Sequence, residues 1–322
     1  MIYFIFDNPA DKQKMEFLKD YDTSSFERIF PEKQCKSIKS MLDVCINCIK
    51  KSSSGDTVIF WYDFMGIIFW WLCKIFNRKR QIVILNILLK NKKSMKNKVA
   101  RILYKTALKS KNIKATVTSK EYGVYVNNFL GIKKQYIVLH DIYHERYNIK
   151  YGGKVQNNSV FCGGRNGRNW ELLKNLANEM MDIQFNIVVP KDMYEQYKND
   201  FGANVNIKTE ITETEYLQLM CQSELVIMPL NTEAPAGLIA IFQAVANGKM
   251  TIVSDTVTTQ EYFKNNTEAL CKNRIDDWKI QIRYWVENPQ EAIKCAEKSR
   301  KFLEENCTEK DYAKTLLTVV SE

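Results

Sequence analysis

The chain has 322 residues, of which 45% are apolar and 26% are charged. This composition excludes a wholly disordered chain and predicts a folded protein with room for two domains of about 150 residues each. Lysine and arginine outnumber aspartate and glutamate by 47 to 37, which gives a net charge of +10 at pH 7. An excess of positive charge favours anionic partners such as nucleotide phosphates, phospholipid or nucleic acid, and does not select among them.

Short apolar runs alternate with helical patterns along the chain. The predicted strands are residues 2–6, 57–62, 81–87, 115–118, 136–140, 159–163, 185–189, 205–208, 225–229 and 251–255. This alternation indicates parallel sheets covered by helices on both faces. The polar, glycine-bearing segment 148–158 separates two sets of strands and is predicted to be a linker.

The predicted fold class is therefore α/β, with two doubly wound, Rossmann-like domains that face each other across a cleft. Residues 1–148 form the first domain and residues 149–322 form the second. The last helix either stays with the second domain or crosses back to the first. Ligands of such sheets bind beyond the carboxyl ends of the strands, so the residues that follow each strand are the candidates for function.

Nine cysteines and two histidines limit the metal and redox chemistry of the chain. The first residues show neither a basic region ahead of an apolar run nor a small-residue cleavage site, so we expect reduced thiols in a cytoplasmic protein. Cys45 and Cys48 form a CxxC pair, but no second CxxC or histidine pair lies at the spacing of zinc ligands. We predict buried apolar thiols and no metal site.

The window 58–76 is the most apolar part of the sequence. Its length nearly spans a bilayer, but Asp63 would cost about 3 kcal/mol at the centre of a spanning helix. A buried strand over residues 57–62, followed by a buried helix over residues 64–76, explains the same composition without this cost. The aromatic cluster of Phe69, Trp70 and Trp71 still favours contact with a membrane surface.

Charge is concentrated in one segment. Between Asp63 and Glu121 the sequence has fifteen basic residues and no acidic one. Within it, residues 94–110 are predicted to form a helix with one apolar face and basic residues near another; the apolar face consists of Met95, Val99, Ile102 and Leu103. This helix is either a solvated surface helix or one that rests on an anionic bilayer, where each basic residue adds about 1 kcal/mol of binding.

The first motif with chemical meaning is SVFCGGRNGRNWELLKNL, residues 159–176. A strand ends at Gly163 and Gly164, a turn carries Arg165 and Arg168, and a helix begins near Asn169. Glycines let a ligand approach the backbone, and a helix N-terminus offers free N–H groups with a positive dipole end. The arginines add charged, bidentate donors for phosphate oxygens, so Gly164, Arg165 and Arg168 are predicted to bind a diphosphate.

The second motif spans residues 228–256. A strand ends near Pro229, a loop of small residues follows, and a helix starts at Ala236, Gly237 and Leu238, whose amides are a second predicted phosphate site. Glu233 in the loop is a candidate acceptor for sugar hydroxyl groups, and Gln243 is placed to reach back from the helix. Two helix starts suited to anions within one domain are what a nucleotide diphosphate needs.

Together these motifs, with the strand that ends in Val189 and Pro190 between them, resemble the nucleotide-sugar-binding domain of GT-B glycosyltransferases. The resemblance is most specific to the retaining family-four group of capsule, exopolysaccharide and O-antigen biosynthesis. It implies that Arg165 and Arg168 hold the donor diphosphate, and it assigns Val189 and Pro190 to the nucleobase. Gln243 stands where the family usually has the glutamate that binds ribose, and Glu233 is the nearest acid for the donor sugar.

The resemblance implies transfer of a sugar from a UDP- or GDP-linked donor to a saccharide or polyprenyl-linked acceptor in surface polysaccharide synthesis. Neither a metal nor a cofactor is implied. Asp63, His140 and Asp141, which follow strands of the first domain, are the candidates for catalysis and for orienting the acceptor. The implied location is the cytoplasm, either in solution or peripherally on the anionic inner face of the plasma membrane.

Two alternatives remain open. A non-catalytic, nucleotide-sugar-binding partner of another transferase is favoured by the glutamine at position 243. A nucleic-acid-binding protein is suggested by the charge, but the basic segment lacks interleaved glycine and aromatic residues and contains no recognisable binding motif. We therefore predict no nucleic-acid partner.

Overall fold

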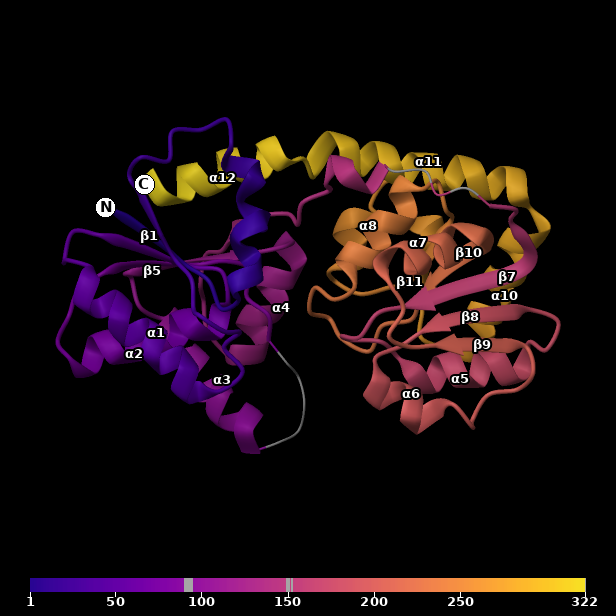
Figure 1. Cartoon of the computed structure of the whole chain (residues 1–322), viewed down its shortest axis with the longest axis horizontal. Helices are drawn as coiled ribbons and strands as arrows, with labels where there is room; N and C mark the ends of the chain where they lie inside the picture. Colours follow the sequence, from indigo (N-terminus) through magenta and orange to yellow (C-terminus); the bar gives the residue numbers. More distant parts are fainter. Residues whose placement is uncertain (90–94, 149–150, 152, 322) are drawn as a thin grey trace. The chain divides into compact units, whose positions relative to one another are not determined.

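The computed structural model describes residues 1–89, 95–148, 151 and 153–321. The chain divides into two compact units (Figure 1). Unit 1 comprises Met1–Asp141 together with Glu309–Glu322, and unit 2 comprises Ile142–Thr308. The boundary expected after residue 148 lies a few residues further along the chain than this division, and the last helix belongs to unit 1.

In unit 1 the described residues form one sheet of parallel strands. Their spatial order is β2 (Phe26–Ile29), β1 (Ile2–Ile5), β3 (Thr57–Phe60), β4 (Gln81–Ile84), β5 (Ile113–Val117) and β6 (Ile137–Val138). The central strands are continuous apolar runs, as parallel strands covered on both faces require. In β3, for example, Val58, Ile59 and Phe60 have no exposed surface.

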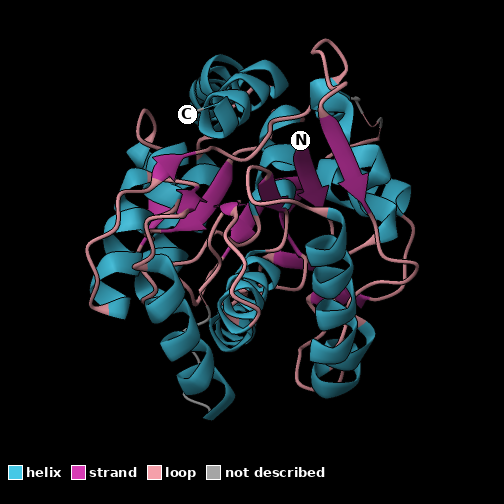
Figure 2. Ribbon diagram, turned by 90° about the vertical axis from the view of Figure 1, so that its left-hand side faces the viewer, coloured by secondary structure: helices cyan, strands magenta, loops and turns pink. Residues whose placement is uncertain are grey.

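Helices cover both faces of this sheet. One face carries α1 (Ile38–Lys51), α2 (Asp63–Ile75), α3 (Met95–Leu108) and α4 (Lys120–Leu130), each packed on the next. The other face carries the 3-10 helix η1 (Pro9–Leu18) and α12 (Glu309–Ser321), which contact each other. Figure 2 shows α12, marked by the C-terminus, on one side of the strands and further helices on the opposite side.

Unit 2 repeats this architecture. Its strands lie in the order β12 (Leu270–Cys271), β11 (Thr251–Ser254), β10 (Ser223–Met228), β7 (Gln156–Gly163), β8 (Gln184–Val188) and β9 (Val205–Lys208), all parallel. Helices α5 (Trp170–Glu179) and α6 (Lys191–Tyr197) lie on one face, where α10 (Ile275–Glu287) contacts α5 (Figure 1). Helices α7 (Glu213–Gln222), α8 (Leu238–Ala246) and α11 (Pro289–Asn306) lie on the other.

The short elements of unit 2 are η2 (Glu145–Asn148), α9 (Thr259–Tyr262) and η3 (Thr267–Ala269). The predicted α/β fold with two doubly wound parallel sheets is confirmed, and each predicted strand coincides with an observed one. The predicted linker over residues 148–158 is partly wrong, because β7 already begins at Gln156. Polar residues at the start of a strand therefore looked like a loop in the sequence.

The apolar window is a buried strand followed by a buried helix, as predicted. Phe69 and Trp70 are buried, and the Trp70 indole Nε1 donates to Asn112 Oδ1 at 3.3 Å. The expected contact with a membrane is therefore wrong for these two rings, which pack α2 within unit 1, and stays a prediction for the half-buried Trp71. Across the described part of the chain, we find no helix with both the length and the apolar character needed to span a membrane.

All nine cysteines are buried, and none of them is in a disulfide bond within the described part of the chain. Burial raises the pKa of the Cys45 thiol well above its ordinary value and that of Cys48 to about 12. Within the described residues, no group of three or more His, Cys, Asp or Glu side chains is arranged to hold a metal ion. The CxxC pair belongs to the packed interior of unit 1.

Candidate functional site

Two loops meet at the carboxyl edge of the unit 2 sheet. Strands β7 and β10 are neighbours, but the chain leaves β7 for α5 on one face and leaves β10 for α8 on the other. Such a divergence is the point at which doubly wound sheets bind ligands. The loops are joined by backbone hydrogen bonds from Asn169 N to Pro229 O (2.8 Å) and from Asn231 N to Gly167 O (2.9 Å).

Arg168 is the buried cation between these loops, with only 4% of its surface exposed. Its Nε and Nη2 donate to Gly163 O at 2.9 and 2.8 Å, and its Nη1 donates to Asn166 O at 3.1 Å. Of the described carboxylates, none forms an ion pair with Arg168. Among the described residues, the guanidinium group is therefore held in place by the carbonyl oxygens of Gly163 and Asn166.

Two glycines leave the space that this guanidinium occupies. A Cβ atom on Gly164 would collide with Arg168 Nη2, and a Cβ atom on Gly237 would collide with Nη1. Both residues have positive φ, 112° at Gly164 and 77° at Gly237, which favours glycine there in any case. The structure thus brings together Gly164, Arg168 and Gly237 from the two sequence motifs.

Helix α8 starts directly beside Arg168. Gly237 is its N-cap residue, and no described side chain caps its first turn. The amides of that turn, including that of the buried Leu238, therefore present a positive dipole end next to the guanidinium. Ala236 lies just ahead of this helix and packs close to Gly167.

Arg165 differs from Arg168 in its surroundings. It is exposed, and its Nη2 lies 3.8 Å from the carboxylate of Asp192, which is also exposed. Such pairs contribute about 0–1 kcal/mol, so Arg165 can exchange this partner for another anion at little cost. The prediction that Arg165 binds a phosphate stays a prediction.

Glu233 and Gln243 are the two residues predicted to contact the sugar and the ribose of the donor. Glu233 Oε2 accepts a hydrogen bond from Val257 N at 2.8 Å, and the Glu233 carbonyl accepts one from Thr258 Oγ1 at 2.7 Å. This residue therefore ties the loop after β10 to the loop after β11. Gln243 is buried in the second turn of α8. Their contacts with a sugar or ribose remain predictions.

The predicted nucleobase residues follow β8 at the same edge of the sheet. Val189 is buried and donates its N–H to Lys208 O at 3.0 Å, and Pro190 is the N-cap residue of α6. Both lie one strand away from the loop that carries Arg168. Their contact with a base remains a prediction.

Tyr216 is a neighbour of the site that the sequence analysis did not single out. Its ring packs edge-to-face on Phe161, with centroids 5.0 Å apart, and lies so close to Gly163 that any Cβ there would collide with it. Burial raises the pKa of the Tyr216 hydroxyl, and the positive charge of Arg168 opposes the rise. In the sequence, the glycine at position 163 indicated that another group lies close to the backbone there, but it did not identify that group as Tyr216.

Unit 1 presents polar residues of a different kind at the carboxyl edge of its sheet. Asp63, at the start of α2, is buried, and its carboxylate accepts hydrogen bonds from Phe64 N (2.8 Å) and Leu88 N (2.7 Å). Both oxygens therefore help to hold the backbone around them. The proposed catalytic role of Asp63 remains a prediction, with this structural role beside it.

Asp141 follows β6 and is half-buried. Asn86 Nδ2 lies 3.4 Å from Asp141 Oδ1, and Asn86 is in turn held by Thr116 Oγ1, which donates to Asn86 Oδ1 at 3.0 Å. Burial raises the pKa of the Asp141 carboxyl from 3.8 to about 6, while nearby His140 and the Asn86 hydrogen bond oppose the rise. A carboxylate with this pKa is suited to accept a proton near neutral pH.

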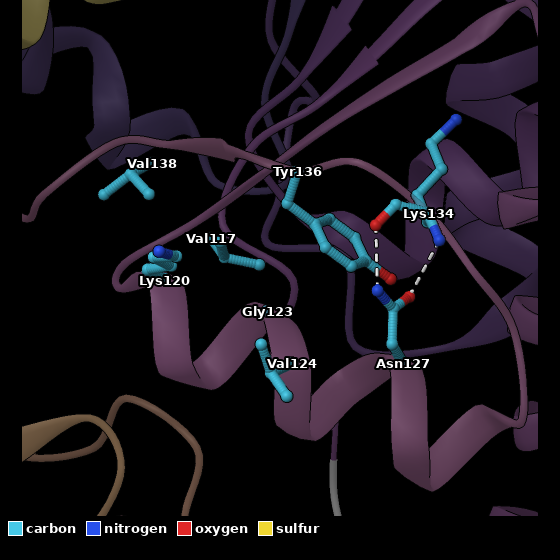
Figure 3. Close-up of a pocket in the computed structure, with 8 residues that line it drawn as sticks. All are labelled: Val117, Lys120, Gly123, Val124, Asn127, Lys134, Tyr136 and Val138. Carbon is cyan, nitrogen blue, oxygen red and sulfur yellow. Dashed lines mark hydrogen bonds between the residues drawn. The ribbon is translucent and has the colours of Figure 1, made fainter.

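The described part of unit 1 also contains a small cavity of about 150 Å³ between β5, β6 and α4. Asn127 bonds across one end of it, donating to Lys134 O at 2.8 Å and accepting from Lys134 N at 3.0 Å (Figure 3). Sites for small molecules usually enclose about 300–1,000 Å³. This cavity is too small for a nucleotide sugar.

Comparison with known proteins agrees with the fold of the two units. Residues 165–318 match the family model described as glycosyl transferase-like. HepE from Anabaena, solved in complex with UDP-glucose, is 12% identical and superposes with a TM-score of 0.72, covering 100% of both chains. Sucrose-phosphate synthase from Thermosynechococcus elongatus is 13% identical, with a TM-score of 0.71 over 99% of this chain and 98% of that one. The chain has the GT-B fold.

A third GT-B structure, that of TarM, is 15% identical with a TM-score of 0.66. The match covers 87% of this chain but only 58% of TarM, so this chain spans less than two thirds of that protein. No curated protein sequence matches the chain significantly. The predicted resemblance to GT-B glycosyltransferases is confirmed at the level of fold and family model, while the family-four subgroup stays a prediction.

Proposed function

We propose that the protein is a glycosyltransferase that moves a sugar from a nucleotide diphosphate sugar to an acceptor hydroxyl group. The observation that carries this proposal is Arg168, a buried cation without a carboxylate partner in the described residues, held against Gly237 at the open start of α8. A buried charge is costly unless a counter-charge accompanies it. A diphosphate supplies that counter-charge and accepts hydrogen bonds from the amides of α8.

In the proposed reaction the bond from the sugar anomeric carbon to the diphosphate oxygen breaks, and its electron pair stays on the diphosphate. A new bond forms from the acceptor oxygen to the anomeric carbon. Arg168, Arg165 and the first amides of α8 stabilise the charge that builds up on the leaving group, an electrostatic contribution of about 3–4 kcal/mol for each well-placed donor. Interactions of this kind lower the barrier without a protein nucleophile.

The acceptor hydroxyl must also lose its proton. We propose two acceptors for it, the leaving phosphate itself or the Asp141 carboxylate, with His140 and Asp63 as further candidates for orienting the acceptor. The resemblance to retaining enzymes supports retention of the anomeric configuration without a metal ion or cofactor. It likewise supports a saccharide or polyprenyl-linked acceptor, a UDP- or GDP-linked donor, and a cytoplasmic role in surface polysaccharide synthesis.

A binding experiment tests the proposal first. Thermal unfolding and calorimetry of the full chain are measured with UDP, GDP and their common sugar conjugates. We expect one of these nucleotides to stabilise the protein against thermal unfolding. When an acceptor is added to the protein with the matching nucleotide sugar, we expect release of the nucleoside diphosphate at a rate that EDTA does not change. If none of these nucleotides binds, the proposal is wrong; if one binds but no acceptor releases it, the chain is instead a non-catalytic nucleotide-sugar-binding partner.

A further inference from the structure

Helix α3 exposes large apolar side chains to solvent. Met95 is 72% exposed, Ile102 62% and Val99 52%. At 3.6 residues per turn these three positions fall on one face of the helix. Apolar side chains grouped on a surface gain free energy when another apolar phase covers them, and such groups mark sites of protein or membrane contact.

Cationic side chains border this apolar strip. Lys98, Lys105 and Lys109 are exposed; the helical period places Lys98 and Lys105 on the same side of the strip, and Lys109 directly follows the end of α3. Arg101, one turn away, is different because its guanidinium stacks over the Phe129 ring at 4.4 Å and donates to the Phe129 carbonyl. Arg101 therefore joins α3 to α4, whereas the three lysines carry the surface charge.

The end of α2 has the same character. Ile75 is 71% exposed and Phe76 is 51% exposed. The exposed cations Lys74, Arg78 and Lys79 flank them in the sequence.

Asn112 connects the two regions, since its Nδ2 donates to Arg80 O at 2.8 Å and its Oδ1 accepts from Trp70. The turn after α2 therefore lies beside the segment that follows α3, and both helices pack on the same face of the sheet (Figure 1). We call the exposed residues together the basic apolar surface; they are Lys74, Ile75, Phe76, Arg78, Lys79, Met95, Lys98, Val99, Ile102, Lys105 and Lys109.

We propose that the basic apolar surface docks unit 1 on an anionic lipid bilayer. Its apolar side chains enter the boundary between headgroups and acyl chains, while the lysine and arginine stems reach lipid phosphates. Because the sequence from residue 64 to residue 120 has no acidic residue, nothing in this segment repels the anionic surface. Nucleic acid would use the cations but would leave Met95, Val99 and Ile102 in water.

The test is co-sedimentation of the full chain with vesicles, in the absence of donor and acceptor, so its outcome is independent of transferase activity. Vesicles of phosphatidylcholine with phosphatidylglycerol are compared with vesicles of phosphatidylcholine alone at physiological salt. We expect binding to the anionic vesicles. Failure of the unmodified chain to pellet with them would overturn the proposal.

Two double variants distinguish the insertion of apolar side chains into the bilayer from the electrostatic attraction of lysines to its surface. V99S with I102S keeps every charge, and we expect about tenfold weaker binding from the lost apolar area. K98Q with K109Q keeps the apolar strip, and we expect about 25-fold weaker binding from the lost attraction. The matched control is I280S with I293S, two exposed apolar residues of unit 2, for which we expect unchanged binding.

All variants are first compared with the unmodified chain by circular dichroism and thermal unfolding. If V99S with I102S pellets as well as the unmodified chain, the apolar strip does not enter the bilayer and the proposal is wrong. If a DNA or RNA duplex binds the chain, prevents vesicle binding and is bound equally by V99S with I102S, the surface is a nucleic-acid site and the proposal is also wrong.

Discussion

The two units share an architecture and differ in the chemistry at the carboxyl edges of their sheets. In unit 2 this edge presents Arg168, glycines and the open start of α8, all suited to negative charge. In unit 1 it presents Asn86 and Asp141, which suit hydroxyl and amide groups, while the carboxylate of Asp63 already accepts hydrogen bonds from backbone N–H groups. Similar backbones therefore bring different side chains to equivalent positions, and this contrast assigns the anionic donor to unit 2 and an acceptor hydroxyl to unit 1 in the proposed function.

The largest effect is expected at Arg168. Arg168→Ala should weaken nucleoside diphosphate binding by about 4 kcal/mol, or roughly a thousandfold, because the phosphate loses a buried charge partner. Arg168→Lys keeps the charge and loses the planar fork, so a smaller loss of about a hundredfold is expected. Calorimetry on variants with native circular dichroism measures both, and unchanged affinity in a folded Arg168→Ala variant would remove this residue from the site.

The second prediction concerns the core of unit 1. The Tyr312 ring, buried on α12, meets Phe17 edge-to-face with centroids 4.8 Å apart. Tyr312→Ala should lower the local free energy of unfolding by about 3 kcal/mol, because it leaves a cavity in the aromatic cluster. Hydrogen exchange followed by mass spectrometry should show faster exchange in unit 1 and no change in unit 2.

The control for this substitution is Tyr284→Ala on the surface of unit 2, where the side chain is exposed. We expect a change within about 0.5 kcal/mol. Faster exchange in both units after Tyr312→Ala would contradict the assignment of α12 to unit 1.

The third prediction concerns the pH dependence of unit 1. The folded-state pKa of Asp141 is raised by burial from 3.8 to about 6, so the folded state binds this proton more tightly than the unfolded state does. Its contribution to stability is therefore fully present below pH 3.8 and is lost as the pH rises through about 6. Asp141→Asn removes this loss and should stabilise unit 1 by about 2 kcal/mol at pH 8.

That gain should disappear below about pH 4, where the native carboxyl is protonated as well. Denaturant unfolding across the pH range measures the difference, and a gain that is constant with pH would contradict the raised pKa. If Asp141 is the base, the same variant loses glycosyl transfer and keeps nucleotide binding. Unit 1 would then carry a residue that costs stability and serves catalysis.

The smallest effect is expected at Arg165. Arg165→Ala should weaken donor binding by about 1 kcal/mol, because the residue is exposed and already shares its charge with Asp192. Asp192→Ala frees the arginine and should leave the affinity unchanged or slightly higher. A loss at Arg165 equal to that at Arg168 would show that burial does not rank the two arginines.

The alternation of apolar runs was sufficient to predict both sheets, because parallel strands are buried on both faces and show as continuous apolar segments. The analysis missed β2 and β12, since Phe26–Ile29 carries two charged residues and Leu270–Cys271 is very short. Both lie at sheet edges, where the apolar signal is weakest. The motif around Gly164 and the helix start at Gly237 were also predicted from the sequence.

The ranking of the site residues could not be predicted. Arg165 and Arg168 are three residues apart in one turn, and only the fold decides that one is buried and the other exposed. The hydrogen bonds of Asp63 to the backbone and the raised pKa of Asp141 likewise depend on neighbours from distant parts of the chain. The exposed face of α3 was ambiguous because the same helical period describes a buried stripe.

The place of α12 has a consequence for biosynthesis. Lys114 Nζ in unit 1 donates to Val319 O at 3.0 Å, and Tyr312 completes the aromatic cluster around Phe17. The ribosome makes all of unit 2 before it makes Tyr312 and Val319. One face of the unit 1 sheet therefore stays incompletely covered until α12 is synthesised, some 170 residues after β6. By then the whole sequence of unit 2 is already available to fold.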